Sequence, residues 1–352
     1  MRTSALTLRA LVAATIVVGV AAPAHAQFYA QHNLVSDGAV PADFVDPLLV
    51  NAWGLVASGG SPWWVANNGT GTSTLYNGNT GAKVPLNVMV PGAPTGVVFN
   101  GTTGFAIPSH GTARFIFASE DGTISAWSGG TQAFVVVDHS ATGAIYKGLA
   151  IAQTAAGAFI YATNFHAGTV EVFDSTWAPV ATFGFTDPAI PAGYVPFGIQ
   201  NIGGAIFVTY ALQDENAKDD VPGEGHGYVN AFDATGHFVQ RVASQGSLDS
   251  PWGLALAPAG FGTFSGDLLV GNFGNGRIHA FVPAPAGEFE DHGPLHSTAG
   301  RPIEIPGLWA LQFGNGAAAG PKTTLFFTSG PFDEQHGLFG SLVVAHPPGH
   351  NP

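Results

Sequence analysis

Three short motifs recur about every fifty residues along this chain, and this periodicity constrains its fold more than any other feature. The first is an aromatic or polar residue, then Gly, then an aliphatic residue, as in Trp252-Gly253-Leu254. The second is a short apolar run that closes on a polar residue, as in Leu269 to Asn272, and the third is Gly-x-apolar-x-x-aromatic, as in Gly276 to Phe281. Six such repeats, each long enough for four short strands, predict an all-β, six-bladed β-propeller.

The start of the mature chain supplies a strand that fits this prediction. Residues Phe28 to Gly38 resemble Phe238 to Gly246, the fourth strand of another repeat. We therefore expect an N-terminal strand to pair with the last blade and close the ring, which leaves no open terminal edge. A two-domain β-sandwich is the alternative, but it does not explain six motifs in register.

We expect residues 27–352 to form a single propeller domain with two insertions, at 211–226 and 283–305. The first is acidic, with five carboxylates and one lysine, Lys218. It is interpreted as a solvated loop or as a calcium-binding loop, although the EF-hand spacing after Asp214 is absent. The second carries His292 and His296.

Residues 1–26 have the pattern of a signal peptide. Arg2 and Arg9 precede the apolar run Leu11 to Ala22, and Ala24-His25-Ala26 matches a cleavage site. The mature chain is predicted to begin at Gln27 and to be exported, to the periplasm or beyond the cell. An uncleaved anchor is the alternative. No later run is apolar enough for a membrane helix.

Composition narrows the class of partner. The formal net charge is −13, so an acidic surface is predicted to repel nucleic acids. The chain contains no cysteine, which excludes disulfides, thiolate metal sites and cysteine nucleophiles. With 49 glycines, 25 prolines and 9% charged residues, the composition suits short strands and tight turns better than helices.

Several motifs together resemble an uncharacterised family of exported bacterial β-propellers. The resemblance covers nearly all of the mature chain and is carried by the following stretches: Asp46 to Leu55, Phe197 to Asn201, Val208 to Ala211, Pro251 to Leu254, Leu268 to Gly274 and Gly307 to Leu311. It implies a propeller similar to NHL-repeat and gluconolactonase-like folds, and no established activity. Some members carry a C-terminal sorting signal, whereas this chain ends in His346-Pro-Pro-Gly-His-Asn-Pro352 without a hydrophobic tail.

The repeat register predicts a ring of polar side chains at one mouth of the central channel. The residues that close the second motif are Asn67, Glu120, Asn164, Tyr210, Asn272 and Ser329. Asn67, Glu120, Asn164 and Asn272 supply oxygen atoms of the kind that Ca²⁺ prefers, so they are one candidate metal site. The other interpretation is that the asparagines cap strand ends.

The residues that open the first motif are predicted to line the same mouth. The candidate ligand-binding residues, taken from both rings, are Trp53, Lys147, Phe197, Tyr210, Trp252 and Trp309. The tryptophans are interpreted either as core between blades or as aromatic platforms for a flat ligand such as a sugar.

Candidate catalytic residues are few. His166 and His336 each lie just past a ring position and are candidates for a general base. No His-Glu-x-x-His or Gly-x-Ser-x-Gly motif is present. The Gly271 to Gly276 stretch superficially resembles a nucleotide loop, but a turn between strands is the better interpretation.

Two functions remain open from the sequence. One is an exported propeller that binds a small molecule or a peptide segment at the channel mouth. The other is a calcium-dependent lactonase or esterase, in which the ion polarises a carbonyl and His166 activates water. A lyase acting through a similar ion is a third possibility.

Overall fold

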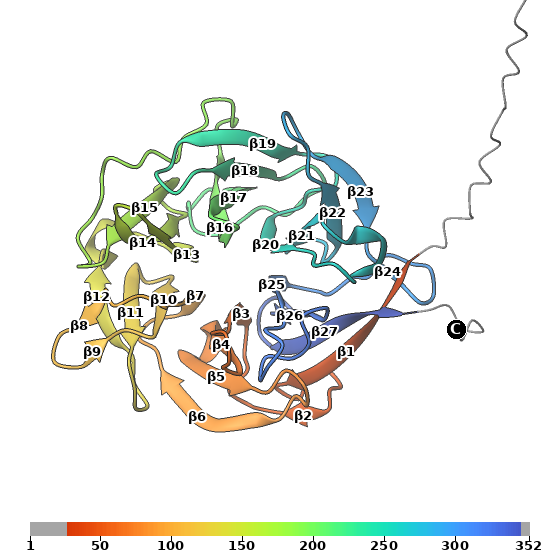
Figure 1. Cartoon of the computed structure of the whole chain (residues 1–352), viewed down its shortest axis with the longest axis horizontal. Helices are drawn as coiled ribbons and strands as arrows, with labels where there is room; N and C mark the ends of the chain where they lie inside the picture. The colour runs from red at the N-terminus through yellow and green to blue at the C-terminus, as the bar shows by residue number, and fades with distance from the viewer. Residues whose placement is uncertain (1–26, 346–352) are drawn as a thin grey trace, which may run out of the picture.

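The computed structural model describes residues 27–345, which form six β-sheets arranged as blades around a central axis (Figure 1). The predicted six-bladed β-propeller is confirmed. The predicted signal peptide at 1–26 lies outside the described residues. Between residues 27 and 345 no helix is long and apolar enough to cross a membrane.

The first three blades follow one another along the chain, each with its first strand nearest the axis (Figure 1). Blade 1 consists of β3 (Ala52–Val56), β4 (Trp63–Asn67), β5 (Thr72–Tyr76) and β6 (Lys83–Met89). Blade 2 consists of β7 (Pro94–Phe99), β10 (Phe115–Ser119), β11 (Thr123–Trp127) and β12 (Phe134–Asp138). Blade 3 has only three strands, β13 (Tyr146–Thr154), β14 (Gly157–Asn164) and β15 (Thr169–Asp174).

The last three blades complete the ring. Blade 4 consists of β16 (Tyr194–Ile202), β17 (Ala205–Leu212), β18 (Tyr228–Phe232) and β19 (Phe238–Ser244). Blade 5 consists of β20 (Pro251–Leu256), β21 (Leu268–Asn272), β22 (Ile278–Val282) and β23 (Glu290–Pro294). Blade 6 consists of β25 (Leu308–Phe313), β26 (Leu325–Ser329), β27 (Leu338–Ala345) and β1 (Phe28–Ser36).

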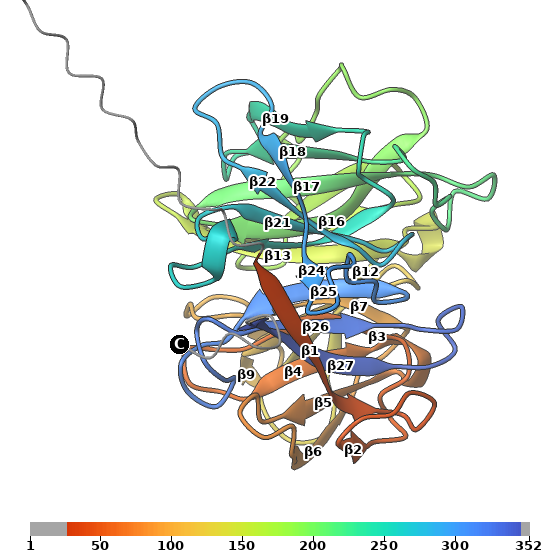
Figure 2. The ribbon, with the colours of Figure 1, turned by 90° about the vertical axis from the view of Figure 1, so that its right-hand side faces the viewer.

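The chain start closes the ring as predicted. Strand β1 pairs antiparallel with β27 from Phe28–Ala345 to Ser36–Leu338, and Figure 2 shows the two strands side by side at the edge of blade 6. Two short strands extend this sheet by parallel pairing with β1, namely β2 (Phe44–Val45) and β24 (His296–Ser297). Strand β1 therefore covers the outer edge of β27.

The second predicted insertion, 283–305, is more ordered than a loop. It contains β23, the outer strand of blade 5, and then β24, which pairs with β1 of blade 6. This segment carries no strand signal in the sequence, because β23 is exposed and consists of Glu-Asp-His-Gly-Pro. The remaining small elements are the hairpin β8 (Ala106–Ile107) with β9 (Gly111–Thr112) and three 3₁₀ turns, η1 (Asn68–Thr70), η2 (Ser140–Thr142) and η3 (Gly262–Phe264).

The glycine of the first motif lets neighbouring blades approach closely around the axis. A Cβ on Gly54 would lie 2.4 Å from the Thr95 carbonyl oxygen of the next blade, and one on Gly198 would lie 2.2 Å from that of Trp252. Backbone contact at this range excludes any side chain, so glycine recurs for a steric reason. Blade 6 has Ala310 at the corresponding position.

Buried apolar side chains form one cluster at each of the six blade interfaces and a seventh on the axis. The axial cluster joins Trp53, Phe165, Phe197 and Trp309, with Trp252 and Phe273 packed against it. The inner strands start at this end of the channel, which we call the mouth, and run toward the other end, which we call the opposite face. The fold thus fixes where a site on the axis can lie.

Candidate functional site

A stack of aromatic rings fills the axis at the mouth. The rings of Trp53 and Trp309 are parallel with centroids 3.6 Å apart, and Phe273 stacks on the other side of Trp309 at 4.1 Å. Trp252 and Phe197 meet Trp309 edge-on, each at 5.9 Å. Four of the predicted ligand-binding residues, the three tryptophans and Phe197, therefore meet as one apolar plug.

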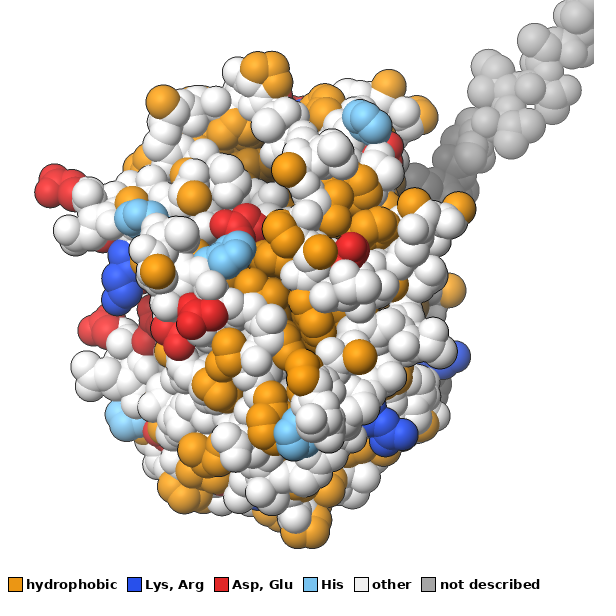
Figure 3. All heavy atoms as spheres, turned by 90° about the vertical axis from the view of Figure 1, so that its left-hand side faces the viewer, with side chains coloured by type: hydrophobic (Ala, Val, Ile, Leu, Met, Phe, Trp, Pro, Cys, Tyr) orange, Lys and Arg blue, Asp and Glu red, His pale blue; other side chains and the backbone are white. Residues whose placement is uncertain are grey.

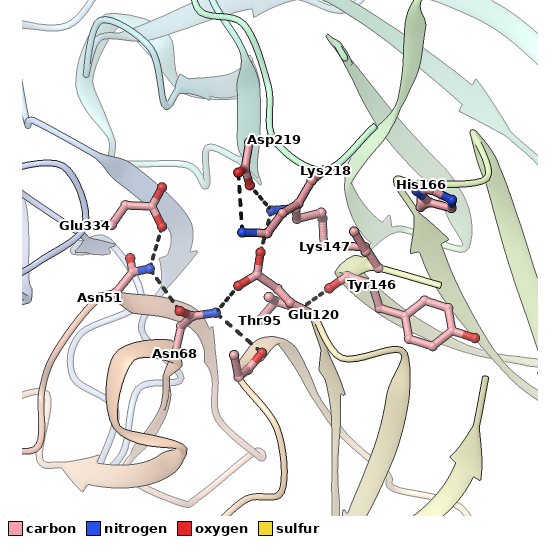
Figure 4. Close-up of polar contacts among 12 residues, drawn as sticks. Asn51, Asn68, Thr95, Glu120, Tyr146, Lys147, His166, Lys218, Asp219 and Glu334 are labelled. Atoms are coloured by element: carbon pink, nitrogen blue, oxygen red, sulfur yellow. Dashed lines mark hydrogen bonds and ion pairs between the residues drawn. The ribbon is translucent and has the colours of Figure 1, made fainter. Parts of the chain in front are cut away.

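Lys147 lies on this plug, and its side chain is only 3% exposed. Its Nζ donates to Glu120 Oε1 at 2.5 Å and to Asp219 Oδ1 at 3.0 Å, and it stands 5.2 Å from the Trp53 ring centroid (Figure 4). Burial lowers the pKa of Lys147, but the two carboxylates outweigh it and hold the pKa above its ordinary value. The lysine is therefore a permanent buried cation.

A chain of amide and carboxylate groups continues from Glu120 across the mouth. Asn68 Nδ2 donates to Glu120 Oε2 at 2.8 Å, and Asn51 Nδ2 donates to Asn68 Oδ1 at 3.2 Å (Figure 4). Asn51 also donates to Glu334 Oε2 at 2.6 Å and accepts from the Trp309 indole at 2.9 Å. Burial raises the pKa of Glu334, with the lysine and Asn51 acting in the opposite direction. The polar groups thus form one layer over the aromatic plug.

The backbone around this layer is strained. Phe332, Asp333 and Glu334 are three consecutive non-glycine residues in the left-handed region, with φ of 57°, 53° and 64°. Asn51 and Ser250, each two residues before a tryptophan of the plug, have φ of 45° and 46°. Such conformations persist where the surroundings enforce them, and they gather at functional sites.

The acidic insertion folds over the mouth as a hairpin. Gln213 bridges Asp220, and the Asp214 carboxylate accepts from the backbone N–H groups of Lys218 and Asp219. The tip reaches the mouth through Asp219, which binds Lys147, and through the Ala217 carbonyl oxygen, which lies 3.2 Å from His166 Nδ1. The sequence left a solvated loop or a calcium loop open, and the structure shows a hairpin that covers the axis.

Asp220 is the most unusual group of this hairpin. Burial raises the pKa of its carboxyl to about 6, with Ser250 and Lys147 lowering it in part. Its Oδ2 atom is buried without a hydrogen-bond partner among the described residues. A carboxyl that titrates near neutrality beside a buried cation is typical of functional sites.

The two predicted catalytic histidines lie at the rim. His166 is exposed and stands apart from the Lys147 cluster in Figure 4, with the Ala217 carbonyl as its partner. His336 Nδ1 lies 2.7 Å from Asp37 Oδ2, and its ring meets Phe332 edge-on. Neither imidazole contacts the axial cluster through a hydrogen bond in the described part of the chain.

The six residues of the predicted polar ring do not occupy equivalent positions in their blades. The predicted copy of the motif in blade 2 is one residue out of register, so Glu120 lies one position further along than the other five. Asn67 pairs with Ala52, and its equivalent in blade 2 is Ser119, which pairs with Pro94, so Glu120 corresponds to Asn68. Residues at the end of the second strand face the blade interfaces, whereas the next residue faces the axis. The axial set is therefore Asn68, Glu120, Phe165, Ala211, Phe273 and Gly330.

The remaining ring residues accordingly lie away from the axis. Asn67 donates to the hydroxyls of Thr72 and Thr74, Asn164 donates to Glu171, and Asn272 donates to the Ser247 carbonyl. Tyr210 packs between blades 3 and 4. These side chains stabilise strand ends and interfaces.

The four residues expected to hold calcium already form other hydrogen bonds. The three asparagines are committed to separate blades, and Glu120 is paired with Lys147 and Asn68. Within residues 27–345 no three His, Asp or Glu side chains are grouped as metal ligands. This donor set does not fit a calcium ion.

Most acidic groups and the larger hollows lie in different places. In Figure 3 most Asp and Glu side chains lie toward the left of the side drawn, Lys and Arg side chains lie at both edges, and hydrophobic ones occupy the middle. Beneath the plug, the channel narrows to a cavity of about 20 Å³. Larger hollows, of about 590, 540 and 360 Å³, are lined by Phe99 and its neighbours at the ends of the inner strands, on the opposite face.

Comparison with known proteins found relatives without an assigned activity. The Uncharacterized protein R648 of Acanthamoeba polyphaga mimivirus is 35% identical over 332 residues, which cover 88% of this chain and 78% of that protein. The Uncharacterized protein L690 of the same virus is 32% identical over 335 residues, covering 88% and 84%. No family model matches the chain. These relatives are viral, so the bacterial origin expected for the family is not supported.

Solved structures share the fold at low identity. The apo aldose sugar dehydrogenase of Escherichia coli has a TM-score of 0.55 at 11% identity, covering 90% of this chain and all of that one. The virginiamycin B lyase of Staphylococcus aureus has a TM-score of 0.54 at 12% identity, covering 91% and 100%. At such identities the likeness shows the propeller fold alone.

Proposed function

The chain belongs to the same family as the mimivirus proteins R648 and L690, and we propose that it binds a small carboxylate at the channel mouth through Lys147. One observation carries this proposal. Lys147 is a buried cation, and one of its two counter-charges comes from the tip of an insertion whose carboxylate, Asp219, is 53% exposed. A buried charge needs a partner of opposite charge, but a carboxylate other than that of Asp219 can fill this role.

The two ion pairs of Lys147 differ in strength. Glu120 is 19% exposed, is also bound by Asn68, and belongs to the blade framework. Asp219 is half exposed, so solvent screens its attraction to the lysine and its departure costs little. A ligand carboxylate can therefore take the place of Asp219, with Glu120 keeping Lys147 in position.

The surroundings of Lys147 suit the body of such a ligand. Trp53 provides an aromatic floor 5.2 Å from the lysine Nζ, and the Glu334–Asn51–Asn68 chain provides hydrogen-bonding groups beside it. Mostly apolar walls with a few placed polar groups are the usual composition of small-molecule sites. Entry requires the 211–226 hairpin to lift from the mouth.

A hydrolase is the second candidate, favoured by one specific observation. Two carboxyls at the mouth, Asp220 and Glu334, have raised pKa values, and Asp220 titrates at about 6. A carboxyl with a pKa of about 6, such as Asp220, can exchange protons near neutral pH as a general acid or base, and Glu334 supplies a second carboxyl at the same mouth. Hydrolysis of a lactone or ester by these two carboxyl groups requires no calcium ion bound by Asn67, Asn164 and Asn272.

Binding is tested by calorimetric titration with the non-aromatic carboxylates acetate and propionate against their neutral amides, acetamide and propionamide. The carboxylates are expected to bind, Asp219→Asn to tighten them about tenfold by removing the competing carboxylate, and Lys147→Met to abolish binding. Lys322→Met, at an exposed lysine, is the matched control. Unchanged carboxylate binding by Lys147→Met would contradict the proposal.

The hydrolase candidate is tested separately with a panel of lactones and p-nitrophenyl esters. Turnover that survives a chelator and falls at least a hundredfold in both Asp220→Asn and Glu334→Gln would support it. No turnover by the wild-type protein leaves binding as the function.

Export is proposed from residues 1–26 and is tested by the mass of the mature protein, expected to begin at Gln27.

A further inference from the structure

A second cavity, unrelated to Lys147, opens on the opposite face between blades 1 and 2. Its volume is about 590 Å³, within the range of small-molecule sites. It lies where β3 and β7 end and β10 begins, at the far end of the strands from the mouth. Its walls are formed by side chains at the end of the apolar cluster that lies between blades 1 and 2.

Three aromatic rings form the wall of this cavity. Trp64 and Phe115 stack with centroids 4.0 Å apart, and Trp127 lies 4.7 Å from Trp64. The Trp127 indole donates to the Gly130 carbonyl at 2.9 Å. Trp64 is only 3% exposed and Trp127 8%, so these rings contribute their edges to the cavity. The wall therefore presents apolar aromatic surface.

Arg114 stands at the edge of the same cavity and is exposed. Arg241 and Arg277 pair with Asp187 and Glu304, whereas the Arg114 guanidinium has no acidic partner in the described part of the chain. Arg301 is likewise without an ion pair among the described residues, but Arg114 is the one cationic side chain among the residues that line this cavity. It offers two parallel N–H donors to a carboxylate.

We propose that this cavity, which we call the blade 1–2 pocket, binds a planar aromatic carboxylate. The ring lies against Trp64, Phe115 and Trp127, and the carboxylate meets Arg114. The size of the cavity, its aromatic wall and its single unpaired cation select this class over a cation. A neutral sugar fits less well, because the polar side chains Ser58, Ser61, Asn100 and Thr102 that also line the cavity are already hydrogen-bonded within their own turns or to the backbone. The pocket is independent of the site at the mouth.

The test is calorimetric titration with 2-naphthoate and its neutral analogue 2-naphthamide. Naphthoate is expected to bind the wild-type protein at least tenfold more tightly than naphthamide. Arg114→Gln should weaken naphthoate about tenfold and leave naphthamide unchanged. Trp127→Leu should weaken both ligands. Arg277→Gln, an exposed arginine on another blade, is the matched control and should change neither.

Three results would overturn the proposal. One is the absence of saturable naphthoate binding. Another is equal binding by Arg114→Gln and the wild type. The third is loss of binding in Lys147→Met with full binding in Arg114→Gln, which would place naphthoate at the mouth instead. Circular dichroism of each variant separates loss of binding from loss of fold, and Arg114→Gln, at an exposed side chain, is expected to fold normally.

Discussion

The two ends of the central channel are built from the same six inner strands but differ in almost every physical property. The mouth is filled by stacked tryptophans and covered by a polar layer that includes Lys147, Glu120 and Glu334. Its backbone is strained at Asn51, Ser250 and residues 332–334. The opposite face is hollowed, with cavities lined by Phe99 and its neighbours. These charged groups and these strained residues are therefore concentrated at the mouth, and the larger cavities lie at the opposite face.

The largest effect is expected from Lys147→Met at the mouth. Removing the buried cation leaves Glu120 without its main partner, and breaking a buried pair on one side costs about 3 kcal/mol in the free energy of unfolding. Chemical denaturation measures the change. The double variant Lys147→Met with Glu120→Gln should regain most of it, and Lys322→Met should show none. Equal stability of Lys147→Met and the wild type would show that the mouth does not depend on a buried ion pair, and would contradict the contrast drawn between the two ends.

Asp220→Asn is expected to stabilise the protein, by at most about 3 kcal/mol. The folded-state pKa of Asp220 is about 6 against an ordinary 3.8, so the folded protein holds this proton more tightly than the unfolded chain. The charged carboxyl therefore lowers stability as pH rises from about 4 to about 6.

The gain should accordingly be full at pH 7.5 and absent at pH 4. Thermal unfolding at both pH values measures it, with the exposed Asp333→Asn as control. A gain of equal size at pH 4 would show that the carboxyl charge is not its cause.

Trp309→Phe should cost about 2 kcal/mol, more than Trp127→Phe on the opposite face. Trp309 packs between two rings and donates to Asn51, whereas Trp127 forms part of a cavity wall. Denaturation of both variants compares packing at the two ends. A larger cost for Trp127→Phe would reverse the comparison.

The smallest effect is expected at the strained turn. Asp333 is exposed and has φ of 53°, so Asp333→Gly should relieve strain and stabilise the protein by about 0.5–1 kcal/mol. Asp333→Ala is the control, because alanine has the same steric conflict as other side chains. Equal shifts in the unfolding midpoint for the two variants would show that strain is not released.

The sequence predicted the blades, the axial aromatics and two members of the polar layer, Lys147 and Glu120, but not Asn51, Asn68, Asp219 or Glu334. Motif periodicity located Trp53, Lys147, Phe197, Trp252 and Trp309 because the inner strands repeat strictly. It placed strand-end residues such as Asn67 on the axis, whereas the next residue, Asn68, faces the axis as Glu120 does. Side chains alternate at a strand end, so a shift of one residue moves the group from the axis to the blade interface.

The other partners of Lys147 could not be found from repeats. Asp219 comes from an insertion that only one blade has, and Glu334 reaches the mouth through a left-handed turn of non-glycine residues. Neither has a counterpart in the other blades. Asn51 offered one weak signal, its place two residues before a tryptophan of the first motif.

The central claim is that a ligand carboxylate takes the place of Asp219 on Lys147. A crystal structure of the protein with the tightest-binding carboxylate of the panel tests it most directly. The predicted result is a carboxylate oxygen within hydrogen-bond distance of Lys147 Nζ, with Glu120 in place and the 211–226 hairpin lifted. A ligand bound elsewhere, with the Lys147–Asp219 pair intact, would contradict the account.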